Sequence, residues 1–232
     1  MAKKKKIKRK ELLKEPDEFL TLSSRLFNWI ITHQRQLYAA GIIVASLFVL
    51  YMAGYFYYRH INRKAQALYN VAYEALASNM KPSTDAKAWA KTQELFQEVI
   101  NRYSLSKASC LALSQAAYAA YRQKKYDEAI ALYEKFLSKI GDEPNYRMLI
   151  QMALAACYEE KGEIDQAIQL LELLSEEKAN PFRELALINL ARVYRLANKV
   201  EDSKRVLKEF IVAFPDSPFL PMEKALLLTL EG

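Results

Sequence analysis

Residues 154–171 read LAACYEEKGEIDQAIQLL, and this stretch decides the fold because two apolar patterns meet there across a short polar turn. Leu154 and Tyr158 precede the turn at helical spacing. Ile164 and Leu171 bound the second pattern, which has the same spacing. Apolar residues that recur every three or four positions lie on one face of a helix. The stretch therefore predicts two helices joined by a tight connection.

The same pattern returns on both sides of this stretch. The segments YDEAI at 126–130, IDQAI at 164–168 and VEDSK at 200–204 align at steps of 38 and 36 residues. Repeats of this length indicate a solenoid, in which each unit buries its apolar face against its neighbours. The expected copies are about 64–104, 110–144, 148–181 and 184–216, followed by a cap at 217–231.

The copies at 148–181 and 184–216 resemble the tetratricopeptide repeat (TPR), a helix-turn-helix unit with small residues between its helices. The copy at 110–144 is weaker, because Ala120 stands where the family has a tyrosine and Tyr121 comes one residue late. The resemblance implies an all-α fold, in which a TPR-like α-solenoid with a C-terminal capping helix follows a single N-terminal transmembrane helix. An unrelated helical bundle with chance periodicity is the alternative.

The transmembrane helix is expected at residues 36–58, which are uncharged and lie between Arg35 and Arg59. About 20 apolar residues in a helix cross the roughly 30 Å hydrocarbon core of a bilayer. The bulky residues at 55–58 do not suit the small-x-small site at which a signal peptide is cleaved. We therefore expect an uncleaved anchor, and the alternative is a buried helix of a soluble domain.

The basic tail, residues 1–35, carries ten Lys or Arg against four acidic residues, whereas the chain from Arg59 onward is almost neutral. Positive charge favours the cytoplasmic side of a membrane, so the tail is expected in the cytoplasm and the C-terminal part outside it. Attraction to anionic lipid explains the cluster Lys3–Lys6 without a nucleic-acid partner. Within 20 residues of the segment there are two basic residues before it and three after it, so the orientation depends on the more distant lysines.

Residues 16–31, in the second half of this tail, predict an amphipathic helix next to the membrane segment. Pro16 followed by two acidic residues is typical of a helix start. One side of this helix gathers the apolar residues Phe19, Leu20, Leu22, Leu26, Phe27, Trp29, Ile30 and Ile31. The pattern fits a helix in the plane of the lipid headgroups or one that docks on a partner's cytoplasmic face.

The membrane helix is expected to run on into the first repeat helix, since no Pro or Gly interrupts residues 55–80. A break near Asn62 is the alternative. Gly41 and Ala45 form a small-x3-small pair, a spacing that occurs where membrane helices associate. Formation of a homo-oligomer therefore stays open.

The sequence indicates no catalytic chemistry, cofactor or metal. His33 and His60 have no partner residues at metal-ligand spacing, and there is neither a nucleophile motif nor a glycine-rich phosphate loop. In the repeat register Cys110 and Cys157 are offset by about 13 Å along parallel helices. A disulfide requires Cα atoms 4.4–6.8 Å apart, so both cysteines are expected as free thiols that pack as small hydrophobes.

The resemblance to TPR arrays also implies a concave groove, lined by the first helix of each repeat, that holds a partner's segment. The partner-binding residues carried over from that geometry are Gln115, Tyr118, Tyr121, Arg122, Met152, Ala156, Glu159, Asn189, Arg192 and Arg195. Tyr, Met and Arg are enriched in binding surfaces. Ordinary half-buried side chains are the alternative for each position.

The whole layout, with a basic tail, one anchor and exported repeats, resembles the YfgM-like ancillary subunits of the SecYEG translocon. That resemblance implies a non-enzymatic adaptor in the bacterial inner membrane, whose periplasmic domain links the translocon to chaperones or client proteins. A structural scaffold of another envelope complex, for secretion, cell-wall or respiratory assembly, is the alternative. Repeats on the cytosolic side of a membrane are a further alternative, against which the basic tail argues.

Overall fold

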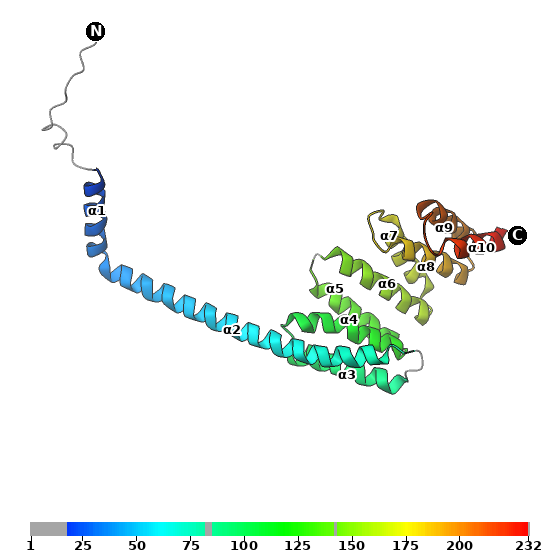
Figure 1. Ribbon diagram of the computed structural model, residues 1–232, viewed down its shortest axis with the longest axis horizontal. Helices are drawn as coiled ribbons and strands as arrows, with labels where there is room; N and C mark the ends of the chain where they lie inside the picture. The colour runs from blue at the N-terminus through cyan, green and yellow to red at the C-terminus, as the bar shows by residue number, and fades with distance from the viewer. Residues whose placement is uncertain (1–17, 82–84, 142, 232) are drawn as a thin grey trace, which may run out of the picture. The chain divides into compact units, whose positions relative to one another are not determined.

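The computed structural model describes residues 18–81, 85–141 and 143–231, and the basic tail to residue 17 lies outside them. The chain divides into two compact units, residues 1–58 and 59–232. Within the described ranges it forms ten α-helices and no strand (Figure 1). The helices are α1 (Glu18–Thr32), α2 (Gln34–Asn79), α3 (Ala86–Arg102), α4 (Lys107–Arg122), α5 (Tyr126–Lys139), α6 (Pro144–Lys161), α7 (Ile164–Glu176), α8 (Arg183–Leu196), α9 (Val200–Ala213) and α10 (Leu220–Glu231).

The first unit contains α1 and the apolar part of α2. The predicted amphipathic segment is helical from Glu18 to Thr32, and the predicted start at Pro16 lies outside the described residues. α2 is long and apolar enough to cross a membrane, and none of its most apolar window is buried within the protein. α2 continues without a break for 46 residues, which confirms the expected continuity past Asn62. The side chain of Asn62 accepts a hydrogen bond from the backbone of Lys107 at 3.1 Å.

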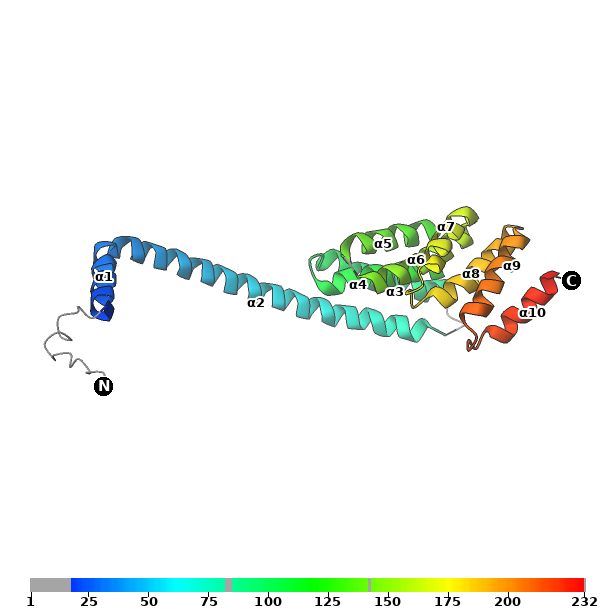
Figure 2. The same cartoon turned by 90° about the horizontal axis from the view of Figure 1, so that it is seen from above.

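The second unit is a stack of helices in which each helix from α3 onward packs on the helices next to it in sequence (Figure 1, Figure 2). The end of α2 joins this stack through Ala65, Ala72 and Leu76, which are buried in its core. The ring of Tyr69 meets that of Phe96 on α3 at 5.5 Å. This arrangement is an all-α, TPR-like solenoid and confirms the predicted fold class.

Small and large side chains share the core. Five alanines of α4 are fully buried, which lets its neighbours approach closely: Ala112, Ala116, Ala117, Ala119 and Ala120. Large aromatic rings fill the remaining space, including Trp89, Phe96 and Phe136. Ala120 is thus buried at the position where the TPR pattern has a tyrosine, and Tyr121 is half-buried one residue later.

The helix connections repeat as the sequence does. Lys124, Gly162 and Asn198 each have a positive φ, at 63°, 87° and 58°, in the turn between the two helices of a unit. They are separated by the same 38 and 36 residues as the sequence repeats. This left-handed backbone suits Gly and Asn but is unfavourable for Lys, because a Cβ atom crowds the carbonyl.

Polar contacts also recur between neighbouring units. Asp127 pairs with Lys161 at 2.6 Å and Asp165 pairs with Lys199 at 3.3 Å. Both pairs span 34 residues and join the start of one unit's second helix to the next unit, at the end of its first helix for Lys161 and in the turn after it for Lys199. They are exposed ion pairs of small individual energy, so the apolar contacts between units carry most of the stability.

Both cysteines are free. Cys157 is buried in the hydrophobic core, and Cys110 is partly buried and packs against the same core. Both cysteines therefore pack as small hydrophobes, as the sequence predicted. Burial raises the pKa of the Cys157 thiol to about 12, so it stays protonated at neutral pH and is a poor nucleophile.

We expect Val206→Ala on α9 to lower the free energy of unfolding by about 2 kcal/mol, since it removes buried methyl groups and leaves a cavity. Val206 is 1% exposed, whereas Val212 on the same helix is 82% exposed. Val212→Ala is the matched control and should change stability little. Urea unfolding of the detergent-solubilised protein measures both, and equal effects would contradict the core described here.

Candidate protein-binding face

The ten predicted partner-binding residues lie on the first helices of three successive units. Four are on α4, three on α6 and three on α8. All ten are half-buried, so each has a surface that a partner can reach and a part that packs within the protein. We call this set the first-helix face.

Arg122 is held between two aromatic rings at the α3–α4 end of the face. Its guanidinium carbon lies 4.4 Å from the ring centre of Trp89 and 5.8 Å from that of Tyr118. It also donates a hydrogen bond to the Tyr118 hydroxyl at 3.0 Å. A cation over aromatic faces is attracted by their electron-rich surfaces, so Arg122 is already partnered within the chain.

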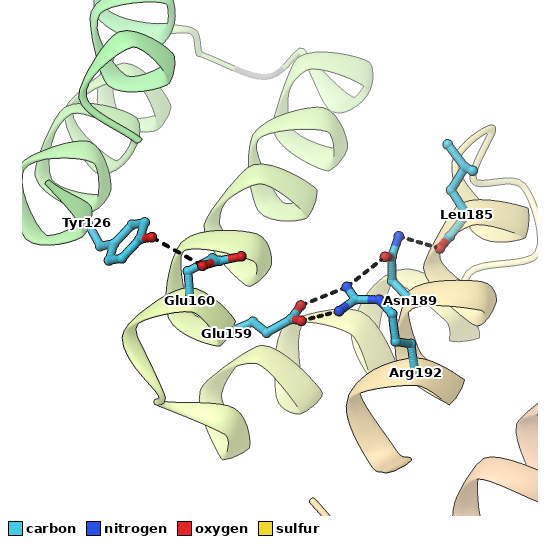
Figure 3. Close-up of polar contacts among 6 residues, drawn as sticks. All are labelled: Tyr126, Glu159, Glu160, Leu185, Asn189 and Arg192. Carbon is cyan, nitrogen blue, oxygen red and sulfur yellow. Dashed lines mark hydrogen bonds and ion pairs between the residues drawn. The ribbon is translucent and has the colours of Figure 1, made fainter. Parts of the chain in front are cut away.

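The centre of the face is an ion pair between α6 and α8. The Arg192 guanidinium donates to both carboxylate oxygens of Glu159, in a two-pronged arrangement (Figure 3). Arg192 also donates to Asn189 at 3.0 Å, and Asn189 donates to the backbone of Leu185 at 2.9 Å. The hydrogen bond from Arg192 to Glu159 raises the pKa of Arg192. This bidentate geometry fixes α8 against α6.

Two tyrosines connect this centre with α4 and α5. The rings of Tyr121 and Tyr126 are 5.7 Å apart, and the Tyr126 hydroxyl donates to Glu160 at 3.1 Å (Figure 3). Burial, and then the negative charge of Glu160, raise the pKa of Tyr121. Its hydroxyl therefore stays protonated and can donate a hydrogen bond to a partner.

Arg195 lies at the α10 end of the face, and its Nε atom is buried without a hydrogen-bond partner. Glu223 on α10 is 3% exposed. Burial raises the pKa of Glu223, and the positive charge of Arg195 opposes part of that rise. Our sequence reasoning did not single out Glu223, although it follows Leu220 at the spacing of the apolar face.

The remaining predicted residues do not form one cluster. Met152 packs against the core of the last repeats, and Gln115 and Ala156 are half-buried on α4 and α6. In the described part of the chain, no hydrogen bond, ion pair or ring contact joins these three to other members of the face. The ten residues are therefore a stripe with local contacts and not a single pocket.

A polar surface that the sequence did not indicate lies over α3 and the start of α5. Its open depression of about 520 Å³ includes Gln93, Lys125 and Glu128. Gln123 donates to Gln93 at 2.7 Å, and Gln93 donates to Glu128 at 2.7 Å. This series of hydrogen bonds between amide and carboxylate groups fixes α3 against α5.

In residues 18–81, 85–141 and 143–231, no group of three His, Cys, Asp or Glu could hold a metal ion.

Residues 35–186 match the tetratricopeptide repeat-like domain, and residues 185–217 match the tetratricopeptide repeat. The chain belongs to the tetratricopeptide repeat-like domain family. TPR units are in general protein-interaction modules, and proteins built from them are typically not catalytic. No protein with a curated description matches the sequence.

Solved TPR structures share the fold. Crystal structures of nearly identical TPR-like repeats of a putative kinesin light chain from Podosopora anserina match in a single-substitution variant and in a second form. Their TM-scores are 0.57 and 0.56 at 17% and 16% identity, and they cover 74% and 72% of this chain and 86% and 85% of their own. A TPR protein from Parabacteroides merdae has a TM-score of 0.57 at 18% identity, over 73% of this chain and 61% of its own.

The buried carboxyl of Glu223 predicts a pH dependence. Because its pKa in the folded protein is raised, the folded state holds the proton more tightly than the unfolded state does. The stabilisation present in acid is lost as the pH rises from the ordinary pKa of 4.5 through the raised one. We expect Glu223→Gln to remove this loss and to raise the free energy of unfolding at pH 7.

Glu231 on the same helix provides the control, because its ion pair with Lys208 at 2.7 Å lowers its pKa. Glu231→Gln should not stabilise the protein at pH 7. Unfolding curves from pH 4 to 8 measure both variants. Parallel curves for Glu223→Gln and the wild type would show that Glu223 is not buried as described.

Proposed function

We propose that this protein is a non-enzymatic, membrane-anchored adaptor whose apolar α2 segment lies in a bacterial inner membrane and whose TPR units bind protein partners. The observation that carries the proposal is the half-buried stripe of side chains on α4, α6 and α8. It lies in the same chain as a helix long and apolar enough to cross a membrane.

The exposure of the apolar part of α2 supports a membrane location. Ile42, Leu47 and Leu50 are 61–68% exposed, as are most apolar side chains around them. A core helix of a soluble domain would bury these groups, since exposed apolar surface is unfavourable in water. Lipid covers such a helix on all sides, and Tyr38 and Tyr58, which lie 20 residues apart at the two ends of the segment, suit the two membrane–water interfaces.

The proposed orientation places the basic tail in the cytoplasm and the repeats in the periplasm. Its support is the excess of Lys and Arg in residues 1–35. We expect protease added to spheroplasts to digest the repeats, and protease added to intact cells to leave them whole. Protection in spheroplasts, with digestion only after lysis, would place the repeats in the cytoplasm.

The proposed partners are the protein-export translocon, through the anchor, and periplasmic chaperones or client peptides, through the first-helix face. The order of basic tail, anchor and TPR units resembles that of the YfgM-like translocon subunits. This resemblance supports the translocon as a partner of the anchor. Tyr118, Tyr121 and Met152 support binding of peptides with apolar side chains, because aromatic residues and Met are enriched in interfaces and Met adapts to varied shapes.

A scaffold subunit of another envelope complex is the second candidate function. The observation that favours it is the pairing of charges within the face, since Arg122 and Arg192 are each held by groups of the same chain. A face with its charges fixed in place is preorganised, which suits one partner of complementary shape.

Ala156→Arg tests the use of the face, because it adds bulk and charge at a half-buried position near the centre of the stripe. Changing Arg192 would instead break its ion pair with Glu159 and disturb the fold. Gln169→Arg on α7 is the control, since Gln169 is exposed on a second helix. Circular dichroism establishes that both variants fold.

Quantitative mass spectrometry of proteins that co-purify in mild detergent gives the readout. We expect Ala156→Arg to lose periplasmic chaperones and clients at least tenfold, or about 1.4 kcal/mol of binding free energy, and to keep the translocon subunits. Gln169→Arg should retain both. A single stoichiometric partner from another envelope machine would support the scaffold, and equal recovery with both variants would exclude the face.

A further inference from the structure

The side chains of α1 leave a broad apolar face uncovered. Five apolar residues in its second half are 42–64% exposed: Leu26, Phe27, Trp29, Ile30 and Ile31. At 100° per residue they occupy one side of the helix, and Ser24, Arg25, Asn28 and Thr32 occupy the other. An exposed apolar face of this size needs a covering surface.

α1 is separated from α2 by a corner at His33. The Thr32 hydroxyl donates to the backbone oxygen of Asn28 at 2.7 Å, and His33 Nδ1 lies 2.9 Å from that of Trp29. The rings of Trp29 and His33 also stack at 5.0 Å. Side chains that bond to carbonyls one turn earlier bend a helix, and α1 turns away from the start of α2 here (Figure 1, Figure 2).

The corner fixes the depth of α1 once α2 crosses a bilayer. Leu37, at the start of the apolar segment, follows Thr32 by five residues, and a helix rises about 1.5 Å per residue. The end of α1 is therefore held within about 8 Å of the hydrocarbon boundary. A helix that turns away at this depth lies across the surface and does not point into the cytoplasm.

The inner side of the corner is itself apolar. Ile30, Ile31, Leu37 and Tyr38, with Gln34, line a depression of about 370 Å³. Acyl chains and glycerol groups occupy this level of a membrane, and Trp29 and Tyr38 are the residue types enriched there. Lipid is therefore available to cover this surface whatever protein partners are present.

We propose that α1 is an interfacial membrane helix, which buries its apolar face among the lipid headgroups and upper acyl chains of the membrane that α2 crosses. The inference rests on the membrane anchoring in the proposed function and deepens it. α1 then sets the depth and rotation of the anchor, while Arg25 on its polar face meets phosphate groups and water.

Trp29 is a native probe of this position. The chain has two tryptophans, and the other, Trp89, is 1% exposed in the repeat core. We would reconstitute full-length Trp89→Phe into phosphatidylethanolamine–phosphatidylglycerol vesicles with lipids brominated near the carbonyl end or near the methyl end. Trp29 emission should shift to the blue and be quenched more by the first lipid than by the second.

The vesicles contain no protein other than this one, so a partner of a different kind cannot shield Trp29 from water. Quenching by aqueous acrylamide with no quenching by either brominated lipid would overturn the inference. Shielding from acrylamide without bromine quenching would show that α1 packs on a second copy of the chain, which also overturns it. The double variant Trp29→Phe, Trp89→Phe gives the background emission without tryptophan.

Phe27→Asp, introduced into the same single-tryptophan protein, should return Trp29 emission toward that of a water-exposed indole. Asn28→Asp is the matched control, since it adds the same charge on the polar face, and it should leave the emission unchanged. Equal effects of the two changes would contradict the proposed face.

Extraction of the vesicles at alkaline pH distinguishes a failure of the interfacial helix from a failure of the membrane anchor. A protein that stays in the vesicles but has a water-exposed Trp29 leaves the anchor intact and removes only the interfacial helix. A protein that washes out shows that α2 does not anchor it, and both proposals then fail.

Discussion

Five alanine side chains on α4 are fully buried, and their small size sets how closely α3 and α5 approach. A larger side chain at any of these positions would overpack a core that has the density of a crystal. Trp89 on α3 and Phe136 on α5 then fill the remaining space between the helices. The spacing between helices thus depends on where the chain places residues that have almost no side chain.

The same constraint positions the first-helix face. Because each helix packs on nearby helices, the orientation of a side chain on α8 is set by α6, α7 and α9 and not by distant parts of the chain. The ion pair of Glu159 with Arg192 then holds two successive first helices in register. The side chains of the stripe that we propose as a partner-binding face therefore have positions fixed by local contacts.

The sequence predicted the features that depend on periodic apolar residues. The steps between residues 126, 164 and 200 located the helix pairs, and the uncharged run at 36–58 located the apolar part of α2. It did not predict contacts that depend on side-chain direction, such as Arg122 over Trp89. Glu223 was missed because its spacing matches an apolar position, and only packing shows that its carboxyl is buried.

The buried carboxyl of Glu223 gives the solenoid a weak end. α10 is held mainly by α9 and carries an unfavourably placed charge, whereas the inner helices are packed on two sides. In a chain of nearest-neighbour contacts, opening spreads from the element that costs least to release. Amide hydrogens of α10 would exchange with solvent before those of α4, and a mechanical load on the C-terminus would unzip the repeats one at a time from that end.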